Sequence, residues 1–364
     1  MAGRPDPAKP QRCRGRELFR ISLQAPEIPK ARLRKPEIRV SLGPVRVANL
    51  PRRSPPRAGK FAAWIAACLL LTWMTGALAA PAVTLVLSDD APLYAGVVRA
   101  LRAELETDRR GWNLRVRTWR EYQSGEEHAD LVVPVGLRAL QSVLAERDNT
   151  PVWALLVPRA SFEQLTGNTS TRGRPVSALY LDQPLSRHMR MLKAALPRTR
   201  KIGVLLGPES SVRPEALRAA AESAHLKIVS ARVDTIEDLV PALNSLRNEI
   251  DALLLVPDPL VVGRGGLHAL LLHTYQLGLP VAAYSAQLLE AGSTLALFAT
   301  PEQIGAEAGS RLRQARGGNS LVLPTPDHSQ NFEVAVNRNV AVSLELRIPS
   351  GEVLRLRMER SIEP

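Results

Sequence analysis

Cysteine is scarce in this chain of 364 residues, which has only Cys13 and Cys68, both before residue 80. The rest of the chain can therefore form no disulfide, no cysteine-based zinc site and no cysteine nucleophile. Aromatic side chains make up only 4% of the residues, which leaves little for a base-stacking platform. The G-x-G-x-x-G, P-loop and G-x-S-x-G motifs are also missing, so no motif predicts a dinucleotide site, a nucleotide-phosphate site or a serine nucleophile.

Most of the chain has no excess of charge of either sign, although the formal net charge of the whole is +13. Residues 1–60 hold 16 of the 48 basic side chains and 4 of the 35 acidic ones. The other 304 residues therefore hold 32 basic and 31 acidic side chains and are almost neutral. Because nucleic-acid binding needs a basic surface, we expect no nucleic-acid partner for this body.

The basic leader, residues 1–60, contains ten prolines and no apolar run with a helical period. Such a segment cannot bury enough apolar surface to offset its chain entropy, which predicts a disordered leader. A leader of this length in front of a secretion signal is unusual. We therefore expect that translation starts downstream, near Val45 or Val47, and a genuine disordered extension is the alternative.

A secretory signal peptide is predicted over residues 61–79. Arg57 and Lys60 precede an apolar run, and small residues close it at Ala77 and Ala79. A basic region, an apolar region and an A-x-A end together direct secretion, so we expect cleavage after Ala79 and a periplasmic protein. An uncleaved membrane anchor is one alternative, because the run approaches the length that spans a bilayer. A lipoprotein modified at Cys68 is the other.

Strands and helices alternate through the remaining 285 residues. Residues 83–87 form a short β-branched run, and residues 91–107 then place apolar side chains at helical spacing. The same pair of patterns returns at residues 202–206 and 213–224. This alternation predicts an α/β fold whose parallel sheets are flanked by helices.

The number of units predicts two Rossmann-like lobes, since this length suffices for two cores. We place the first lobe at residues 80–181 and the second at residues 182–300. Residues 301–364 form a C-terminal segment that is expected to return toward the first lobe.

Candidate ligand residues lie where the expected strands end, because ligands of open α/β sheets bind beyond the carboxyl ends of the strands. They are Ser88, Asp89, Tyr94, Gly136, Tyr180, Pro257, Asp258, Tyr284 and Ser285. Tyr180 would lie where the chain passes between the lobes. The loop at residues 88–90 has an alternative, purely structural role, in which Asp90 caps the helix that starts near Pro92.

Catalytic and metal sites are not predicted. None of the six histidines has a partner four residues away, which is the spacing of a helical metal site. We therefore expect no metal, no cofactor and no catalytic residue.

Three segments resemble a known family. They are Gln183-Pro184-Leu185 continuing through Lys201-Ile202-Gly203-Val204-Leu205, then Asp251-Ala252-Leu253-Leu254-Leu255-Val256-Pro257-Asp258, and finally Phe332 to Asn337 continuing to Leu346-Arg347-Ile348-Pro349. The chain resembles the periplasmic substrate-binding proteins of ABC transporters with a type I binding fold, in particular the group with tryptophan- and tyrosine-binding members. The resemblance covers about residues 180–350, with weaker similarity from residue 83.

The first lobe departs from the family pattern. Where members carry Asp-Pro followed by Gly-Leu, this chain has Val157-Pro158-Arg159-Ala160-Ser161. A later Gly-Asn-Val-Thr-Gly stretch is replaced as well, by residues 171–178. These differences put the first-lobe half of the family's ligand site in doubt.

The resemblance implies a solute-binding protein of an ABC importer. Two lobes would close by hinge bending on a small molecule, an amino acid or a related compound, and the closed monomer would dock on an inner-membrane ABC permease. A non-transport sensor or accessory protein with the same fold, which binds a partner protein, is the alternative. An extracytoplasmic enzyme that faces Asp89 and Asp258 across the cleft is a third possibility and is not favoured.

Overall fold

The computed structural model describes residues 80–122, 128–168, 173–317 and 320–360. The predicted leader (residues 1–60) and signal peptide (residues 61–79) lie outside the described residues. Within the described ranges, no helix combines the length and the apolar character needed to cross a membrane.

The first sheet has six strands in the order β13-β5-β4-β3-β1-β2, and all of its pairings are parallel. The strands are β1 (Ala82–Leu87), β2 (Asn113–Thr118), β3 (Leu131–Val135), β4 (Val152–Val157), β5 (Val176–Tyr180) and β13 (Asp327–His328). Strands β1, β3 and β4 are buried along their whole length. This is the pattern of parallel strands covered on both faces.

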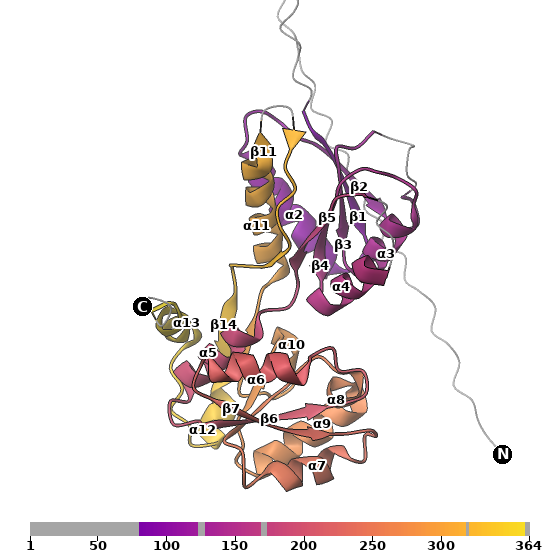
Figure 1. The fold of residues 1–364 in the computed structure, drawn as a ribbon. Helices are drawn as coiled ribbons and strands as arrows, with labels where there is room; N and C mark the ends of the chain where they lie inside the picture. The colour runs from indigo at the N-terminus through magenta and orange to yellow at the C-terminus, as the bar shows by residue number, and fades with distance from the viewer. Residues whose placement is uncertain (1–79, 123–127, 169–172, 318–319, 361–364) are drawn as a thin grey trace, which may run out of the picture. The chain divides into compact units, whose positions relative to one another are not determined.

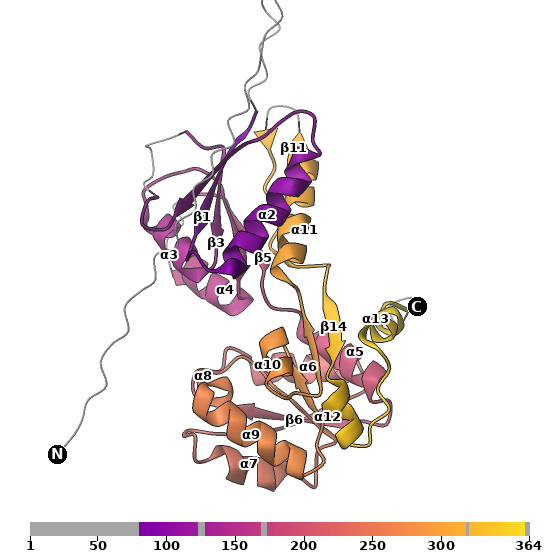
Figure 2. The ribbon, with the colours of Figure 1, turned by 180° about the vertical axis from the view of Figure 1, so that it is seen from behind.

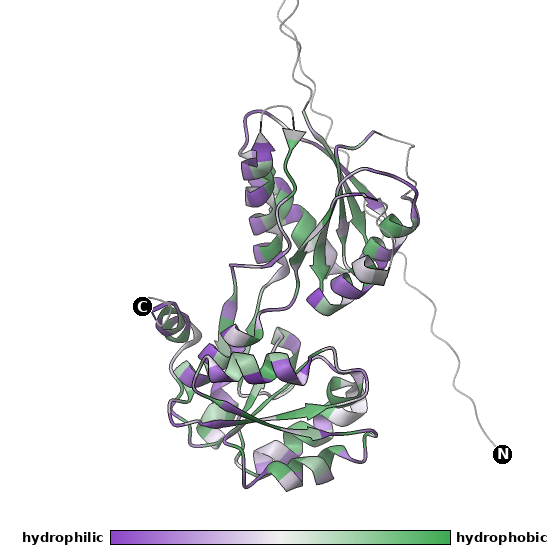
Figure 3. Ribbon diagram, in the orientation of Figure 1, coloured by the Kyte–Doolittle hydropathy of each residue, from purple (hydrophilic) through white to green (hydrophobic). Residues whose placement is uncertain are grey.

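Helices cover both faces of this first sheet (Figures 1 and 2). On one face, α2 (Pro92–Glu106) and α11 (Pro301–Ala315) pack side by side over the strands. On the other face lie α3 (Leu137–Ala145) and α4 (Arg159–Asn168). Figure 3 shows hydrophobic strands beneath helices that carry both hydrophobic and hydrophilic residues.

Helices α2 and α11 approach each other closely at glycines of α11. A Cβ atom added at Gly305 would lie 2.4 Å from the backbone oxygen of Val97. One added at Gly309 would lie 2.6 Å from Cβ of Glu104. The missing side chains therefore allow a helix from the C-terminal part of the chain to pack against the first helix of the lobe.

The second sheet has six strands in the order β14-β10-β9-β8-β6-β7. They are β6 (Lys201–Leu206), β7 (Lys227–Arg232), β8 (Ala252–Leu254), β9 (Val281–Ala283), β10 (Leu295–Phe298) and β14 (Glu333–Val336). Five strands are parallel, whereas β14 runs antiparallel to β10. The prediction of an α/β fold with two lobes is thus confirmed, and the antiparallel edge strand is an addition to it.

Helices cover the second sheet on both faces as well. One core cluster joins α5 (Leu185–Ala195), α6 (Pro214–Glu222), α12 (Arg338–Ser343) and α13 (Gly351–Arg360) to the strands. The opposite cluster joins α7 (Leu239–Leu246) and α9 (Arg264–Gln276) to them. The short elements are α8 (Pro259–Val262), α10 (Ala286–Glu290) and the hairpin of β11 (Arg316–Gly317) and β12 (Ser320–Leu321).

The chain passes between the two sheets three times: between β5 and α5, between β10 and α11, and between β13 and β14. Helix α11 and strand β13 pack with the first sheet, because α11 covers it and β13 pairs with β5. Residues 333–360 pack with the second sheet, because β14 pairs with β10 and α13 packs on α5. The C-terminal segment thus divides between the lobes instead of returning as a whole to the first.

Candidate functional site

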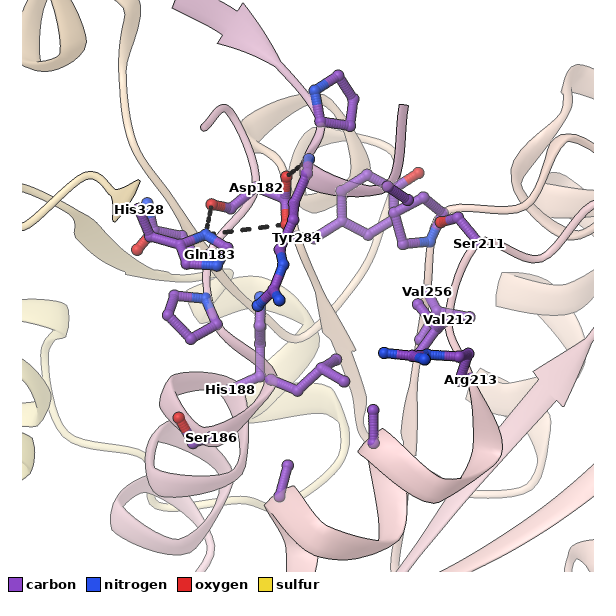
Figure 4. Close-up of a pocket in the computed structure, with 18 of the residues that line it drawn as sticks. Asp182, Gln183, Ser186, His188, Ser211, Val212, Arg213, Val256, Tyr284 and His328 are labelled. Atoms are coloured by element: carbon purple, nitrogen blue, oxygen red, sulfur yellow. Dashed lines mark hydrogen bonds and ion pairs between the residues drawn. The ribbon is translucent and has the colours of Figure 1, made fainter. Parts of the chain in front are cut away.

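A cavity of about 360 Å³ lies among the first crossover, the loop after β4, the start of α6 and the ends of β8 and β9. Of the nine predicted ligand residues, Pro257 and Tyr284 line it. The polar residues of the wall come from several elements; those argued below are Arg159, Glu163, Asp182, Gln183, His188, Arg213, Tyr284 and His328. Figure 4 shows the arrangement of most of these side chains.

Three predicted residues of the first lobe pack against one another and not on the cavity. Ser88 is buried, and its Oγ accepts a hydrogen bond of 2.9 Å from the N–H of Ala139 in α3. Gly136 has a φ of +92°, and a Cβ there would lie 2.6 Å from Ser88 Oγ and 2.8 Å from Cε1 of Tyr94. Glycine is therefore required at this position both by its backbone angle and by its neighbours.

The first loop is not capped as the structural alternative predicted. The N-cap of α2 is Ala91, and no side chain caps the helix, so the capping role of Asp90 was wrong. Pro92 does stand in the first turn, where its missing N–H costs nothing. Asp89 is exposed and accepts a hydrogen bond from the N–H of Asp90 at 2.7 Å. It does not line the cavity.

Tyr180 is buried at the end of β5 and lies outside the cavity wall. Its ring packs edge-on against Phe162 at 5.7 Å and His328 at 5.0 Å between centroids. Burial raises the pKa of the phenol. Tyr180 thus supports His328, which does line the cavity.

Asp182 organises the first-lobe side of the cavity. Its Oδ1 accepts a hydrogen bond of 2.6 Å from the N–H of Arg159, and its backbone oxygen lies 2.7 Å from Nδ1 of His328. The Arg159 guanidinium pairs with Glu163 at 2.6 Å. That hydrogen bond is the main cause of the raised pKa of Arg159. Both carboxylates on this side, those of Asp182 and Glu163, therefore already have donors.

Asp258 is 1% exposed and follows Pro257 on the second-lobe side. Its Oδ1 caps α8 by accepting hydrogen bonds from the N–H groups of Leu260 and Val261, at 2.9 and 3.3 Å. Its Oδ2 is buried and has no partner among the described residues. Burial, helped by the Asp258 charge, raises the pKa of Tyr284.

Ser285 has a structural role at the start of α10. Its Oγ accepts a hydrogen bond of 3.3 Å from the N–H of Leu288, and it does not line the cavity. Most of the predicted residues therefore have structural roles near the strand ends, and only Pro257 and Tyr284 line the cavity.

Gln183, which is not among the residues predicted from sequence, lies in the first crossover and is 6% exposed. Arg187 donates to its Oε1 and also to the backbone oxygen of Ser329, the latter at 2.8 Å. The amide orientation is therefore set by Arg187, and Nε2 is left buried without a partner. The only signal in the sequence was its place in the first of the three family-like segments.

His188, one turn into α5, is also on the wall of the cavity and 5% exposed. Its Nδ1 has no partner among the described residues. Burial, with a smaller effect of Arg187, lowers the pKa of His188 from 6.5 to about 4. The imidazole is therefore neutral at physiological pH. The spacing of the histidines in the sequence gave no sign of this burial.

Acid is expected to destabilise the protein partly through His188. The unfolded chain binds a proton near pH 6.5 and the folded chain near pH 4, so the unfolded state holds more protons between these values. The stability that folding gains from a neutral His188 is therefore fully present above pH 6.5 and is lost as the pH falls toward 4. Between about pH 7 and about pH 4.5 the loss in the free energy of unfolding is about 2 kcal/mol.

Denaturant unfolding at both pH values measures this loss. The drop in the free energy of unfolding should be smaller by that amount in His188→Gln. It should keep its wild-type size in His268→Gln, where the imidazole is exposed. Equal drops in all three proteins would contradict the assignment.

Metal-binding clusters are not found among the described residues: no group of three or more His, Cys, Asp or Glu side chains could hold an ion. What gathers at the cavity is instead a set of hydrogen-bonding groups without partners. Gln183 Nε2 and His188 Nδ1 belong to its wall, while Asp258 Oδ2 and Ser210 Oγ belong to residues next to wall residues.

Solved structures of substrate-binding proteins share this fold at low sequence identity. The ligand-free, open structure of CD0873, a substrate-binding protein with adhesive properties from Clostridium difficile, is 17% identical, covers 75% of this chain and 97% of its own, and has a TM-score of 0.61. An ABC domain in complex with L-Trp from Streptococcus pneumoniae is 16% identical over 76% of this chain and 98% of its own, with a TM-score of 0.52. These similarities confirm the type I architecture.

The sequence comparisons identify the family. No curated protein matches the chain. The family model for ABC transporter substrate binding proteins matches residues 122–359, which is more than half of the chain and includes the three segments that carried the resemblance. The chain therefore belongs to the ABC transporter substrate-binding protein family.

Proposed function

We propose that this protein is an extracytoplasmic solute-binding protein of an ABC importer, which holds an amino acid or a related small compound in the cavity at the first crossover. It would act as a monomer, deliver the solute to an inner-membrane permease and catalyse no reaction. Its route to the periplasm would be the predicted signal peptide.

The observation that carries this proposal is the set of unpartnered polar groups at the cavity. A buried polar atom without a hydrogen bond costs about 1–3 kcal/mol, and folded proteins leave few of them. Here Gln183 Nε2 and His188 Nδ1 are both such atoms, and both residues line one cavity of about 360 Å³. A solute that supplies their partners would recover the cost, and the volume suits a small molecule.

The charges favour a solute with groups of both signs. Arg213 lines the cavity and has no partner among the described residues, and a guanidinium can only donate. Asp258 has a buried oxygen without a partner and can only accept when ionised. An amino acid carries an anionic and a cationic group and could satisfy both. Among the residues predicted from sequence, we assign Pro257 and Tyr284, which line the cavity, as contacts. Asp258 lies next to the wall, and the cationic group of the solute would have to reach past Pro257 to meet it.

Native mass spectrometry tests the proposal. The chain, expressed from its full-length sequence and purified from periplasm without denaturation, should carry an adduct of roughly 100–300 Da that is lost on unfolding. A bare protein that also shows no thermal shift with amino acids, nucleosides or sugars would contradict it and would favour a partner-binding role.

Removal of Tyr284 should weaken solute binding. Tyr284→Ala opens one wall of the cavity, so we expect the affinity for the recovered solute to fall on the order of tenfold or more. Tyr275→Ala removes the same side chain where it is 49% exposed on α9, and should leave binding unchanged. Titration calorimetry compares them; equal affinities would show that the solute does not use this cavity.

A further inference from the structure

The start of α6 forms one wall of the cavity and is not capped. Ser211, Val212, Arg213 and Ala216 all line the cavity. Arg213 is the N-cap residue, and it makes no side-chain capping hydrogen bond. The first-turn N–H groups of a helix have no partner within the helix, and its dipole favours an anion at this end. Pro214 lacks an N–H, which leaves those of Glu215 and Ala216.

A second, independent feature of the same cavity is the Gln183 amide. The bond from Arg187 to its Oε1 leaves the NH₂ group as the free end. Because an amide NH₂ can only donate, the group that completes this site must be an acceptor. Gln183 is more than nine-tenths buried, so no bulk water takes that place.

The two sides of the cavity differ in the charged groups that are left without a partner. On the first-lobe side, Glu163 and Asp182 already accept hydrogen bonds from Arg159. On the α6 side, Arg213 is unpaired, and Figure 4 shows its side chain extending from the start of α6 toward the middle of the cavity. Glu215 lies in the first turn of α6 but does not line the cavity.

We propose that Gln183 Nε2, the uncapped start of α6 and the Arg213 guanidinium together form the subsite for a carboxylate of the solute. The assignment rests on the proposed function, and it adds which end of the solute is recognised and by which groups. An ionised oxygen would complete the Gln183 donor, face the positive end of α6 and pair with Arg213.

Exchange of Gln183 for glutamate is the sharpest test. Gln183→Glu keeps the side-chain shape and strengthens the contact with Arg187, but it replaces the donor by a second acceptor. We expect it to lower the affinity for a carboxylate solute on the order of a hundredfold while the protein stays folded. Gln287→Glu makes the same change on the exposed surface of α10 and should have no effect.

Arg213→Gln provides a second variant in case the first fails to fold, since Arg213 is exposed and its loss leaves no buried group unpaired. We expect a loss of affinity of about tenfold. Unchanged affinity in this variant or in a folded Gln183→Glu would overturn the subsite.

The probe set is the L-amino acids together with their carboxamides, measured by thermal shift and calorimetry on the full-length chain. The acid that binds should do so at least about a hundredfold more tightly than its amide. If amides bind as well as acids, the subsite is overturned and the proposed function stands. If only sugars or nucleosides bind, the subsite and the amino-acid solute are both overturned, and only the solute-binding role stands. If no compound binds and no adduct is recovered, the proposed function falls as well.

Discussion

Gly305→Ala is expected to lower the free energy of unfolding by about 2 kcal/mol, although alanine favours a helix by about 1 kcal/mol over glycine. The added Cβ would lie 2.4 Å from the backbone oxygen of Val97 and 3.0 Å from Cβ of Ala100. Both atoms belong to α2, whose side chains Val97 and Leu101 are fully buried in the first core. Neither can move aside without shifting the helix, so the clash outweighs the gain in propensity.

The matched control is Gly167→Ala. Gly167 lies in α4, is exposed and has no atom within 4 Å of an added Cβ. The same exchange should there leave stability unchanged or raise it by up to about 1 kcal/mol. Denaturant unfolding of both variants compares them. If Gly305→Ala were as stable as Gly167→Ala, helix α11 would not pack on α2 as described.

Glu307→Gln should be the more damaging change, with a loss of about 3 kcal/mol in the free energy of unfolding. Glu307 is a buried residue of α11, whose carboxylate accepts hydrogen bonds from Arg311, Ser329, Gln330 and Asn331. An amide keeps the shape but turns one oxygen into a donor that faces other donors. Arg311 would keep its ion pair with Asp327 at 3.1 Å, so the cost comes mainly from the buried donors of residues 329–331 that lose a charged acceptor.

Glu222→Gln is the control for this charge change, because Glu222 is an exposed residue at the end of α6. Its effect should stay within about 0.5 kcal/mol. Thermal and denaturant unfolding measure both variants. A Glu307→Gln protein as stable as wild type would mean that the carboxylate does not hold the third crossover.

Glu307 also connects the third crossover to the first through hydrogen bonds. Glu307 binds Ser329 through its hydroxyl, and Arg187 binds the backbone oxygen of the same residue. Arg187 in turn holds Gln183 in the first crossover. The third crossover is thus connected by hydrogen bonds to the wall of the cavity.

Local sequence patterns predicted the strands and helices well, because a strand buried on both faces needs an apolar run and a helix packed on a sheet needs apolar residues at helical spacing. The uninterrupted apolar runs of β1, β3 and β4 and the helical spacing of Val97, Leu101 and Leu105 each report burial directly. The antiparallel β14 could not be read in this way. Its four residues form a strand only because β10 lies beside them, almost 40 positions earlier in the chain.

The candidate site was harder to predict, because a strand end marks an edge of a sheet and not a particular cavity. Ser88 and Gly136 do lie at such an edge, but they meet Tyr94 and each other. Gln183 reaches the cavity from a crossover, where no periodic pattern marks it.

By itself, the sequence determined the alternation of strands and helices, the two lobes and the family, since each depends on neighbours along the chain. Only the tertiary structure decided which groups face the cavity and which remain unpartnered. Arg187 selects the free end of the Gln183 amide, and the packing of α5 buries His188. These outcomes depend on contacts between segments far apart in the chain, such as that of Arg187 with Ser329, which no local pattern encodes.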